Sequence, residues 1–463
     1  ALFLFLFFIF LFYNFYWKRR NLPPGPVPLP LVGNLHSIAG DPPGYGVFKK
    51  WHKKYGKICT YFISERPIIS ISDFEMIQEY FVKDGDTFSG RTTLGKFNDF
   101  IRRGDYGIVF TEGEMWKEHR RFALTVFRDL GMSRPIMEQK ILLEQGYFFD
   151  MIKEELSENS KKGTNVNLIP MVEVTIANII NQMLFGFSYH EKEEIKKFSE
   201  WKDLISDHMR TGISPLILTA LEYPEIFRHI PYFKEELQRY REQYCRLTSY
   251  CFEQIKKHKK KFSENPILEP SDFVDYYLKE IEKKNFKTFD EKQLTNFLYD
   301  AFIAGQETTA NTVIYGIIFS LNFPETQKKL QIELDTVIGS DRQITVADRP
   351  DLVYCQAFIN ETLRLTNLLP QNLFHKNLKD VVIGGYRIKK GSTVIPQISC
   401  VLFNEEIFPN PMTFEPGRFI DEKGRLKKIE EFIPFSVGKR QCLGESLART
   451  ELHLLISNFF NNF

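Results

Sequence analysis

The first 17 residues are almost wholly apolar, and a basic cluster, Lys18 to Arg20, follows them directly. A bilayer span needs about 20 apolar residues, with roughly 17 at the short limit. Because basic residues beside a span stay on the cytosolic side, the pattern predicts a membrane anchor with a luminal N-terminus. A cleaved signal peptide is the alternative, but no small-residue cleavage site follows and the apolar stretch is long for one.

Prolines recur through residues 22–30. Proline fixes φ, so this stretch predicts a stiff, extended spacer rather than a helix or strand. A plain linker is the simpler interpretation. Together with the basic cluster it defines a hinge at 18–30, between an anchor at 1–17 and the remaining chain, 31–463.

Beyond the hinge, apolar positions recur mostly at helical spacing. Two segments instead favour strand hairpins: 58–71, with Arg66 and Pro67 in its turn, and 381–398, around a Gly-Gly turn. The expected helices lie within 34–56, around 116–120, within 137–200 with a loop near 160–165, at 294–321, at 324–339, at 352–365, and from 442 to the end. The pattern predicts a mainly α fold with a minor β region.

Residues 91–110 are irregular and glycine-rich, which is typical of a loop. Residues 212–232 are apolar but interrupted by prolines. A solvated loop would not carry so many large apolar side chains. The segment is therefore either one that dips into a membrane surface or a buried core loop. The lysine cluster at 256–261 predicts a solvated face.

Composition narrows the class of protein. The chain has 463 residues, and length alone suggests about three domains. No linker, repeat or low-complexity run divides it, so we expect one large helix-rich unit. Lys and Arg number 61 against 59 Asp and Glu, a balance that gives no reason to expect nucleic acid as a partner. The six cysteines form no CxxC pair, which argues against a disulfide framework or a zinc site and fits a reducing compartment.

One cysteine, Cys442, lies in a glycine-bracketed loop directly before a helical pattern. The first turn of a helix presents unpaired N–H groups and a partial positive charge, and both lower a thiol pKa. Gly438 is free to adopt unusual backbone angles, and Gly444 lets the helix approach a flat partner. Arg440 can bind a carboxylate. A thiolate, a planar group and a carboxylate together describe haem, with Cys442 as the iron ligand.

The stretch from Phe435 to Gly444 has the form Phe-x-x-Gly-x-Arg-x-Cys-x-Gly. It resembles the signature of the cytochrome P450 monooxygenases at every fixed position. The resemblance extends over nearly the whole chain and is strongest to the microsomal, xenobiotic- and lipid-metabolising branch. It implies the cytochrome P450 fold and a haem b cofactor.

Further motifs follow in the order of that family. Trp116 and Arg120 lie four apart on one predicted helical face and suit a haem propionate. The resemblance assigns the same role to His375 and to Arg102 or Arg103, of which we favour Arg103. It also suggests substrate contacts, namely Ile108, Phe110, Ala304, Leu369, Leu373 and Phe374.

The predicted helix 294–321 is interrupted by Gly305 and by threonines, which cost helix stability. The Thr308 hydroxyl can bond back to the Ala304 carbonyl and bend the helix. The small residues would let the helix lie close to a porphyrin. Glu307 and Thr308 resemble the acid–alcohol pair that delivers protons during dioxygen activation.

Glu361 and Arg364 are three apart on one helical face, which alone predicts a surface salt bridge. They resemble the buried Glu-x-x-Arg pair of the family, and Arg418 is expected to complete a triad. Gly417 departs from the family, which usually has Glu there.

The implied reaction inserts one oxygen atom of O₂ into a lipophilic substrate such as a xenobiotic, fatty acid or steroid. Because no flavin or dinucleotide motif is present, electrons are expected from NADPH through cytochrome P450 reductase, with cytochrome b5 as a further candidate. Lys439, Lys117 and Arg121 would form a basic docking face. The alternatives are a haem-thiolate isomerase or dehydratase acting on peroxides and a non-catalytic haem-binding membrane protein.

The expected location is the endoplasmic reticulum membrane, with the catalytic domain facing the cytosol. The predicted last helix ends on apolar residues without a capping glycine. Relatives in the family continue into a strand segment that returns to the substrate pocket. We therefore expect the catalytic domain, 31–463, to be shortened at its C-terminus.

Overall fold

The computed structural model describes residues 2–42, 44–93, 95–132, 134–158, 165–265, 269–284, 287–339 and 342–463. Helices dominate, as predicted. The α-helices are α1 Leu2–Phe15, α2 Leu35–Ala39, α3 Tyr45–Tyr55, α4 Phe74–Ile77, α5 Gly113–Asp129, α6 Pro135–Glu158, α7 Leu168–Leu184, α8 Lys192–Gly212, α9 Pro215–Glu222, α10 Pro224–Phe227, α11 Pro231–Glu264, α12 Phe273–Lys283, α13 Glu291–Asn322, α14 Pro324–Val337, α15 Val353–Thr366, α16 Ile398–Leu402 and α17 Glu445–Asn462. Short 3₁₀ or π turns are η1 Trp17–Arg19, η2 Gln78–Lys83, η3 Asn98–Arg102, η4 Val346–Asp348, η5 Pro416–Phe419 and η6 Gly438–Arg440.

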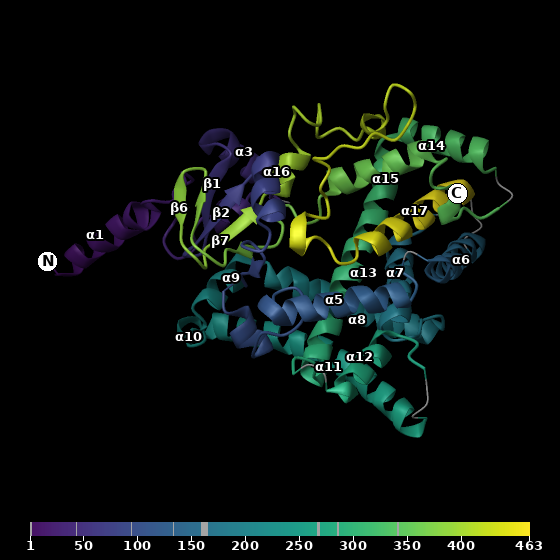
Figure 1. Ribbon diagram of the computed structural model, residues 1–463, viewed down its shortest axis with the longest axis horizontal. Coiled ribbons are helices and arrows are strands. Elements are labelled where there is room, and N and C mark those ends of the chain that lie inside the picture. The colour runs from purple at the N-terminus through teal and green to yellow at the C-terminus, as the bar shows by residue number, and fades with distance from the viewer. Residues whose placement is uncertain are drawn as a thin grey trace.

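The β region is small and lies at the end of the molecule from which α1 extends (Figure 1). Its five-stranded sheet has the order β1-β2-β7-β4-β3, and a separate hairpin pairs β5 with β6. The strands are β1 Ile58–Ile63, β2 Arg66–Ile71, β3 Gly90–Arg91, β4 His375–Lys376, β5 Val381–Ile383, β6 Tyr386–Ile388 and β7 Thr393–Pro396. The mainly α fold with a minor β region is therefore confirmed.

The turn of the first hairpin differs from the prediction. It lies at Ser64 and Glu65, and Ser64 adopts a left-handed φ of 53°. Pro67 instead belongs to β2 and lies opposite Phe62. The proline was a misleading signal, because its fixed φ also fits the start of an extended strand, and β2 pairs with β7 only from Ile68 onward.

The second predicted hairpin is β5–β6, turned by Gly384 and Gly385, both at positive φ. This is the conformation that favours glycine in tight hairpin turns. The rest of that segment, β7, does not continue the hairpin. It joins the larger sheet, parallel to β2.

Helix α13 runs through the middle of the body and packs against α7, α11, α15 and α17 (Figure 1). The Asp290 side chain caps its first turn by accepting the N–H of Gln293 at 2.7 Å. The following helix begins at Pro324 and is stopped by Gly339 at positive φ, as the sequence indicates. Packing against four other helices places α13 in the core of the helical body.

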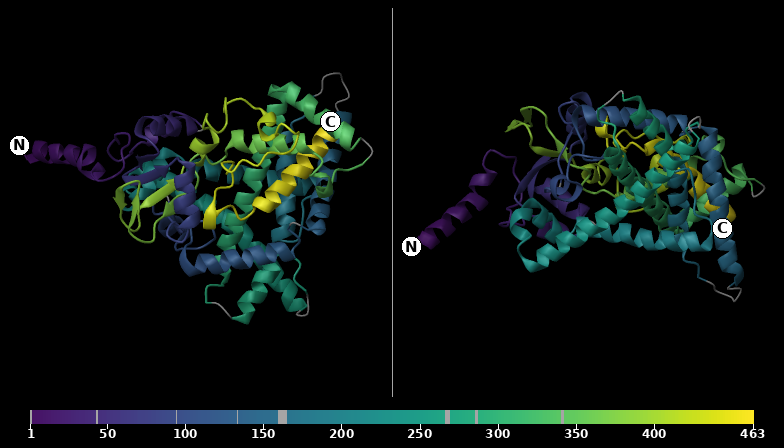
Figure 2. Two further views of the ribbon diagram at one scale, coloured as in Figure 1. Left: turned by 45° about the horizontal axis from the view of Figure 1, so that its top comes forward. Right: turned by 90° about the horizontal axis from the view of Figure 1, so that it is seen from below.

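Helix α1 projects from the body in all three views (Figures 1 and 2). The stretch Leu2–Arg19 is long and apolar enough to cross a membrane, and only 6% of it is buried. The one buried side chain of α1, Asn14, donates a hydrogen bond to the Pro28 carbonyl at 3.0 Å. That bond joins the base of the helix to the proline-rich hinge.

Residues 212–232 form two short helices, α9 and α10, rather than a loop, with prolines at their first turns. The inward face of α9 buries Ile217 and Leu221, whereas Ile213 is 68% exposed and Ile226 62% exposed. The segment thus contributes both to the core and to an apolar surface, at the end of the molecule that carries α1 (Figure 1). The lysines of 256–261 are exposed as predicted. The loop expected near 160–165 lies outside the described residues except for Asn165.

Candidate active site

Cys442 follows η6 and precedes α17, and its N–H donates to the Phe435 carbonyl at 3.0 Å. Its side chain has accessible surface. Burial nevertheless raises the pKa of the thiol, against the opposing effect of the backbone N–H groups of Gly444 and Glu445. Cys442 is therefore accessible but surrounded by protein, as expected for a residue that faces an interior space. Burial thus outweighs the favourable effect of the helix N-terminus on the pKa of this thiol, and a bound metal cation would favour its thiolate form.

The two glycines of the loop have different roles. Gly438 has a φ of +73°, and a Cβ at this position would lie 1.9 Å from the Phe81 carbonyl oxygen. Only glycine fits there. A Cβ on Gly444 would meet no atom within 4 Å, so the start of α17 faces open space. That space suits the close approach of a planar group.

Four basic side chains gather beside this loop: Arg91, Arg120, Arg440 and His375. The Arg440 guanidinium lies 3.7 Å from the centre of the Trp116 ring and donates to the carbonyls of Ser89 and Thr111. Arg120 donates to the Gln441 carbonyl at 2.7 Å. Trp116 and Arg120 share a face of α5 as predicted.

No carboxylate among the described residues forms an ion pair with these four side chains. Burial, Arg91 and Arg120 together lower the pKa of Arg440 to about 8. Burial and the charge of Arg120 lower the pKa of Arg91 to about 9. Each guanidinium thus makes protonation of its neighbours less favourable, and an anion bound among them would remove that penalty.

His375, on β4, completes the cluster. One ring nitrogen, Nδ1, lies 2.7 Å from the Phe88 carbonyl, whereas Nε2 is buried and has no hydrogen-bond partner. Burial and the nearby charges of Arg91 and Arg440 hold the pKa of this imidazole well below its usual range. The Nε of Arg91 is likewise buried without a partner. The Arg91 Nε is thus an orphaned donor, and His375 Nε2 becomes a donor when the imidazole is protonated, so both fit the propionates of a haem.

Arg91 was missed by sequence analysis, because nothing in its surroundings along the chain marks it as special. The structure also removes one predicted alternative. Arg102 forms a buried ion pair with Asp300 of α13, which also accepts the N–H groups of Ile108 and Val109 at 2.8 and 2.9 Å. Because its guanidinium is paired with Asp300, Arg102 is not available to bind a propionate. Arg103 is exposed, and its contact with a propionate stays a prediction.

In the middle of α13, Ala304 and Thr308 are exposed among mostly buried neighbours. The Thr308 hydroxyl donates to the Ala304 carbonyl at 2.7 Å, as predicted. Gly305 has a different role from the expected one. A Cβ on it would lie 2.8 Å from the Ile180 side chain, so Gly305 allows close packing against α7 rather than close approach to a porphyrin.

Glu307 faces Lys202 of α8, and the two side chains form an ion pair at 2.9 Å. Lys202 pairs equally closely with Glu173 of α7. Burial acts to lower the pKa of this lysine, but its two glutamate partners outweigh burial and raise it. In this geometry the Glu307 carboxylate and the Thr308 hydroxyl have separate partners. Sequence analysis did not identify Lys202, which lies 105 residues from Glu307 along the chain.

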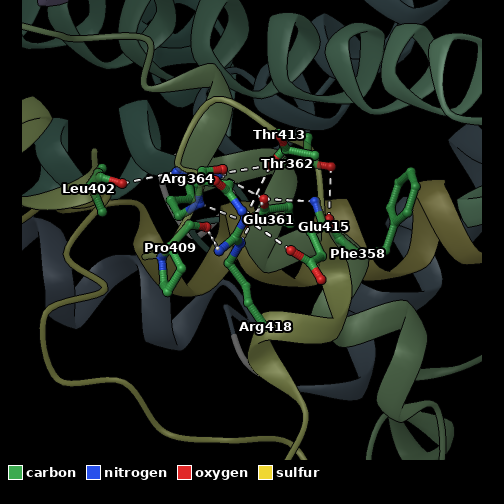
Figure 3. Close-up of polar contacts among 10 residues, drawn as sticks. Phe358, Glu361, Thr362, Arg364, Leu402, Pro409, Thr413, Glu415 and Arg418 are labelled. Carbon is green, nitrogen blue, oxygen red and sulfur yellow. Dashed lines mark hydrogen bonds and ion pairs between the residues drawn. The ribbon is translucent and has the colours of Figure 1, made fainter. Parts of the chain in front are cut away.

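Behind this region, α15 carries a buried ion-pair network (Figure 3). Glu361 accepts from Arg364 at 2.7 and 2.8 Å and from Arg418 at 3.0 Å. Arg364 also donates to the Leu402 carbonyl at 3.0 Å. A Cβ on Gly417 would meet nothing within 4 Å, so the departure from the family leaves the three charged residues in contact.

The suggested substrate contacts differ in their exposure. Leu369 is exposed, Leu373 and Phe110 are half-buried, and Ile108 is packed in the main core. Phe374 packs with the apolar cluster beneath the sheet, which includes Leu218 of α9. The role of these side chains in substrate binding stays a prediction.

Comparison with known proteins shows which family the chain belongs to. The family model for cytochrome P450 matches residues 23–463. The chain is 33% identical to cytochrome P450 2C29 of Mus musculus, over 96% of this chain and 88% of that protein. It is 32% identical to cytochrome P450 2C16 of Oryctolagus cuniculus (97% and 89% covered) and 30% identical to cytochrome P450 2A9 of Mesocricetus auratus (97% and 89%). The chain belongs to the cytochrome P450 family and is a haem monooxygenase.

Proposed function

We propose that Cys442 is the thiolate ligand of the haem iron. The observation that carries this proposal is a desolvated yet accessible thiol beside open space and an unneutralised cluster of cations. Arg91, Arg120, Arg440 and His375 would hold the propionates, and Trp116 would support Arg440 by stacking. When bound, haem-thiolate iron supplies the activation and scission of dioxygen.

Thr308 and Glu307 are the proposed proton donors. The Thr308 hydroxyl is exposed on the face of α13 that also carries Ala304, so it would carry a proton at Oγ1 to the reacting oxygen after rotating away from the Ala304 carbonyl to which it donates. The Glu307 carboxylate is held in place by its ion pair with Lys202. Glu173, Lys202 and Glu307 form a continuous chain of charged groups from half-exposed Glu173 to α13, which can resupply protons.

The proposed substrate is a lipophilic small molecule, namely a xenobiotic, fatty acid or steroid. Electrons would come from NADPH through cytochrome P450 reductase, with cytochrome b5 as a second candidate donor. Lys439, Lys117 and Arg121 are all exposed and would contribute to the docking face. Two of these charges are partly balanced, because Lys439 pairs with Asp86 and Lys117 with Glu114.

The proposed location is the endoplasmic reticulum membrane, with α1 as the anchor and the catalytic body in the cytosol. Support comes from the exposed apolar surface of α1 and from that of α9 and α10 at the same end of the molecule. These surfaces would contact the same bilayer. Substrate would enter from that side.

The carbon monoxide spectrum of the reduced, haem-loaded protein tests the ligand assignment. Wild type is expected to show a thiolate-type band and NADPH-dependent turnover with reductase, and Cys442→Ala to lose both. Cys400→Ala, a cysteine outside the loop, is the matched control and should keep the band. A Cys442→Ala protein with an unchanged band would overturn the assignment. A thiolate band with turnover of peroxides alone would favour the isomerase or dehydratase alternative.

A further inference from the structure

A second cluster of potential ligands lies away from Cys442, where α11 meets α12. It consists of His258 on α11 together with Asp272 and Asp275 at the start of α12. One ligand atom from each residue lies within 4.8 Å of the others, and all three side chains are buried. The described part of the chain holds one such group. The active-site chemistry uses none of its members.

The imidazole of His258 is oriented as in metal sites. Its Nδ1 lies 2.7 Å from the Gln254 carbonyl, to which it donates, and this leaves Nε2 directed at Asp272 Oδ2, 2.9 Å away. Metal-ligating histidines characteristically donate their other N–H to such a carbonyl. Asp272 is fixed as well, because its Oδ1 accepts the N–H of Asp275 at 2.9 Å and caps α12.

Asp275 supplies an independent sign of a missing ligand. Its side chain is fully buried, and its Oδ1 has no hydrogen-bond partner. The other oxygen, Oδ2, accepts from Ser271 and contacts the ammonium of Lys261 at 3.4 Å. Lys261 is itself exposed on a long, adaptable side chain. The negative charge of the Asp275 carboxylate is therefore poorly compensated, because one oxygen has no hydrogen-bond partner and the counter-ion of the other is an exposed lysine.

The cluster is accessible. A cavity of about 700 Å³ opens beside it, lined by His258, Asp272, Ser271 and Lys261 and by aromatic side chains that include Trp201 and Tyr250. An ion can therefore enter, and water from the cavity can complete its coordination. Lys261, at the mouth, can move into solvent when a cation takes its place.

We propose that His258 Nε2 and the carboxylates of Asp272 and Asp275 bind a divalent transition-metal ion of the zinc class. Two carboxylates neutralise the charge of a dication, and an imidazole nitrogen favours zinc over magnesium or calcium. Three protein ligands leave one position open for water. The ion would clamp the end of α11 to the start of α12, independently of haem.

The test uses the full chain loaded with haem, incubated with zinc chloride and dialysed. Elemental analysis and absorption at the zinc K-edge, which is separate from that of iron, measure the bound ion. Wild type is expected to retain about one zinc per chain, with one imidazole and oxygen ligands. His258→Gln and Asp275→Asn should each lower zinc affinity by at least roughly tenfold. His190→Gln, which removes a histidine paired with the single carboxylate of Glu144, should retain zinc.

Folding is checked by circular dichroism and the carbon monoxide spectrum. Asp275→Asn keeps an oxygen that can accept from Ser271, so this variant decides the matter if His258→Gln is misfolded. Zinc should also raise the thermal unfolding midpoint of wild type and His190→Gln but not that of the two ligand variants. Wild-type protein that retains no zinc, or equal retention by all four proteins, overturns the proposal.

Discussion

The ammonium of Lys202 lies 2.9 Å from a carboxylate oxygen of Glu307 and equally close to one of Glu173, so one lysine of α8 joins α13 to α7. The lysine is largely buried, with 8% of its side chain exposed. This contact connects the acid proposed for proton delivery to a half-exposed acid on a neighbouring helix.

Lys202→Met interrupts that chain of charged groups. We expect product formed per NADPH to fall by roughly tenfold, a part of what general acid–base catalysis contributes, with a larger solvent deuterium isotope effect. The carbon monoxide spectrum should not change. Lys192→Met is the matched control, because it removes an exposed α8 ion pair with Glu154. Equal coupling in the two variants would show that Lys202 has only a structural role.

Thr308→Ala removes the hydroxyl that bonds to the Ala304 carbonyl. The variant should bind haem with an unchanged thiolate band, yet consume NADPH with little product, because the proposed proton donor is lost. Thr308→Ser should restore most of the coupling. Peroxide release, NADPH oxidation and product are measured together. Normal coupling in Thr308→Ala would remove the residue from the proposed relay.

The contacts that sequence analysis could predict are local ones. Glu361 with Arg364 and Thr308 with Ala304 are three and four residues apart on helices, so the helix itself brings them together. Arg418 was expected from family resemblance alone, since 57 residues separate it from Glu361.

The contacts that were missed join distant segments. Arg102 meets Asp300 across 198 residues, and Lys202 meets Glu307 across helices α8 and α13. Spacing along one chain carries no information about such pairs. Gly305 illustrates the same limit, because its small size was recognised, whereas the helix it packs against was not.

Arg364→Met leaves Glu361 buried with Arg418 as its one remaining cationic partner among the residues that the structure describes. Breaking a buried ion pair from one side costs about 3–5 kcal/mol. We therefore expect a large fall in the thermal unfolding midpoint and in the yield of haem-loaded protein. Arg425→Met breaks an exposed pair with Asp421 and should change the thermal unfolding midpoint little. Similar losses in both variants would contradict a special role for the buried network.

Arg91→Leu removes one of the cations proposed to hold the propionates. Its buried, unpartnered Nε and its lowered pKa both indicate that an anion belongs beside it. The rate of haem transfer to an excess of a haem-scavenging protein should rise by roughly 10- to 100-fold, because a charge-assisted hydrogen bond worth about 1.5–3 kcal/mol is lost. Arg66→Leu removes an arginine of β2 that pairs with Glu222 and should leave the rate unchanged. Unchanged haem loss in Arg91→Leu would exclude the assignment.

Glu451 on α17 is fully enclosed, and burial raises the pKa of its carboxyl to about 8, against the opposing hydrogen bond from Thr309. The ordinary value is 4.5. The folded protein therefore keeps a proton that the unfolded chain has already lost. The stability contributed by the neutral acid is fully present below the unfolded pKa, and it is lost as the pH rises through the folded pKa.

Glu451→Gln keeps the shape of the side chain but removes the carboxyl group that titrates. Between about pH 5 and pH 8, wild type should lose about 3–5 kcal/mol of stability relative to this variant. Thermal unfolding midpoints of the two haem-loaded proteins, measured across that range, should diverge as the pH rises. Glu193→Gln, an exposed glutamate of α8, should follow wild type. Parallel pH profiles for wild type and Glu451→Gln would mean that the Glu451 carboxyl titrates near its ordinary range, so that no buried neutral acid joins α17 to α13.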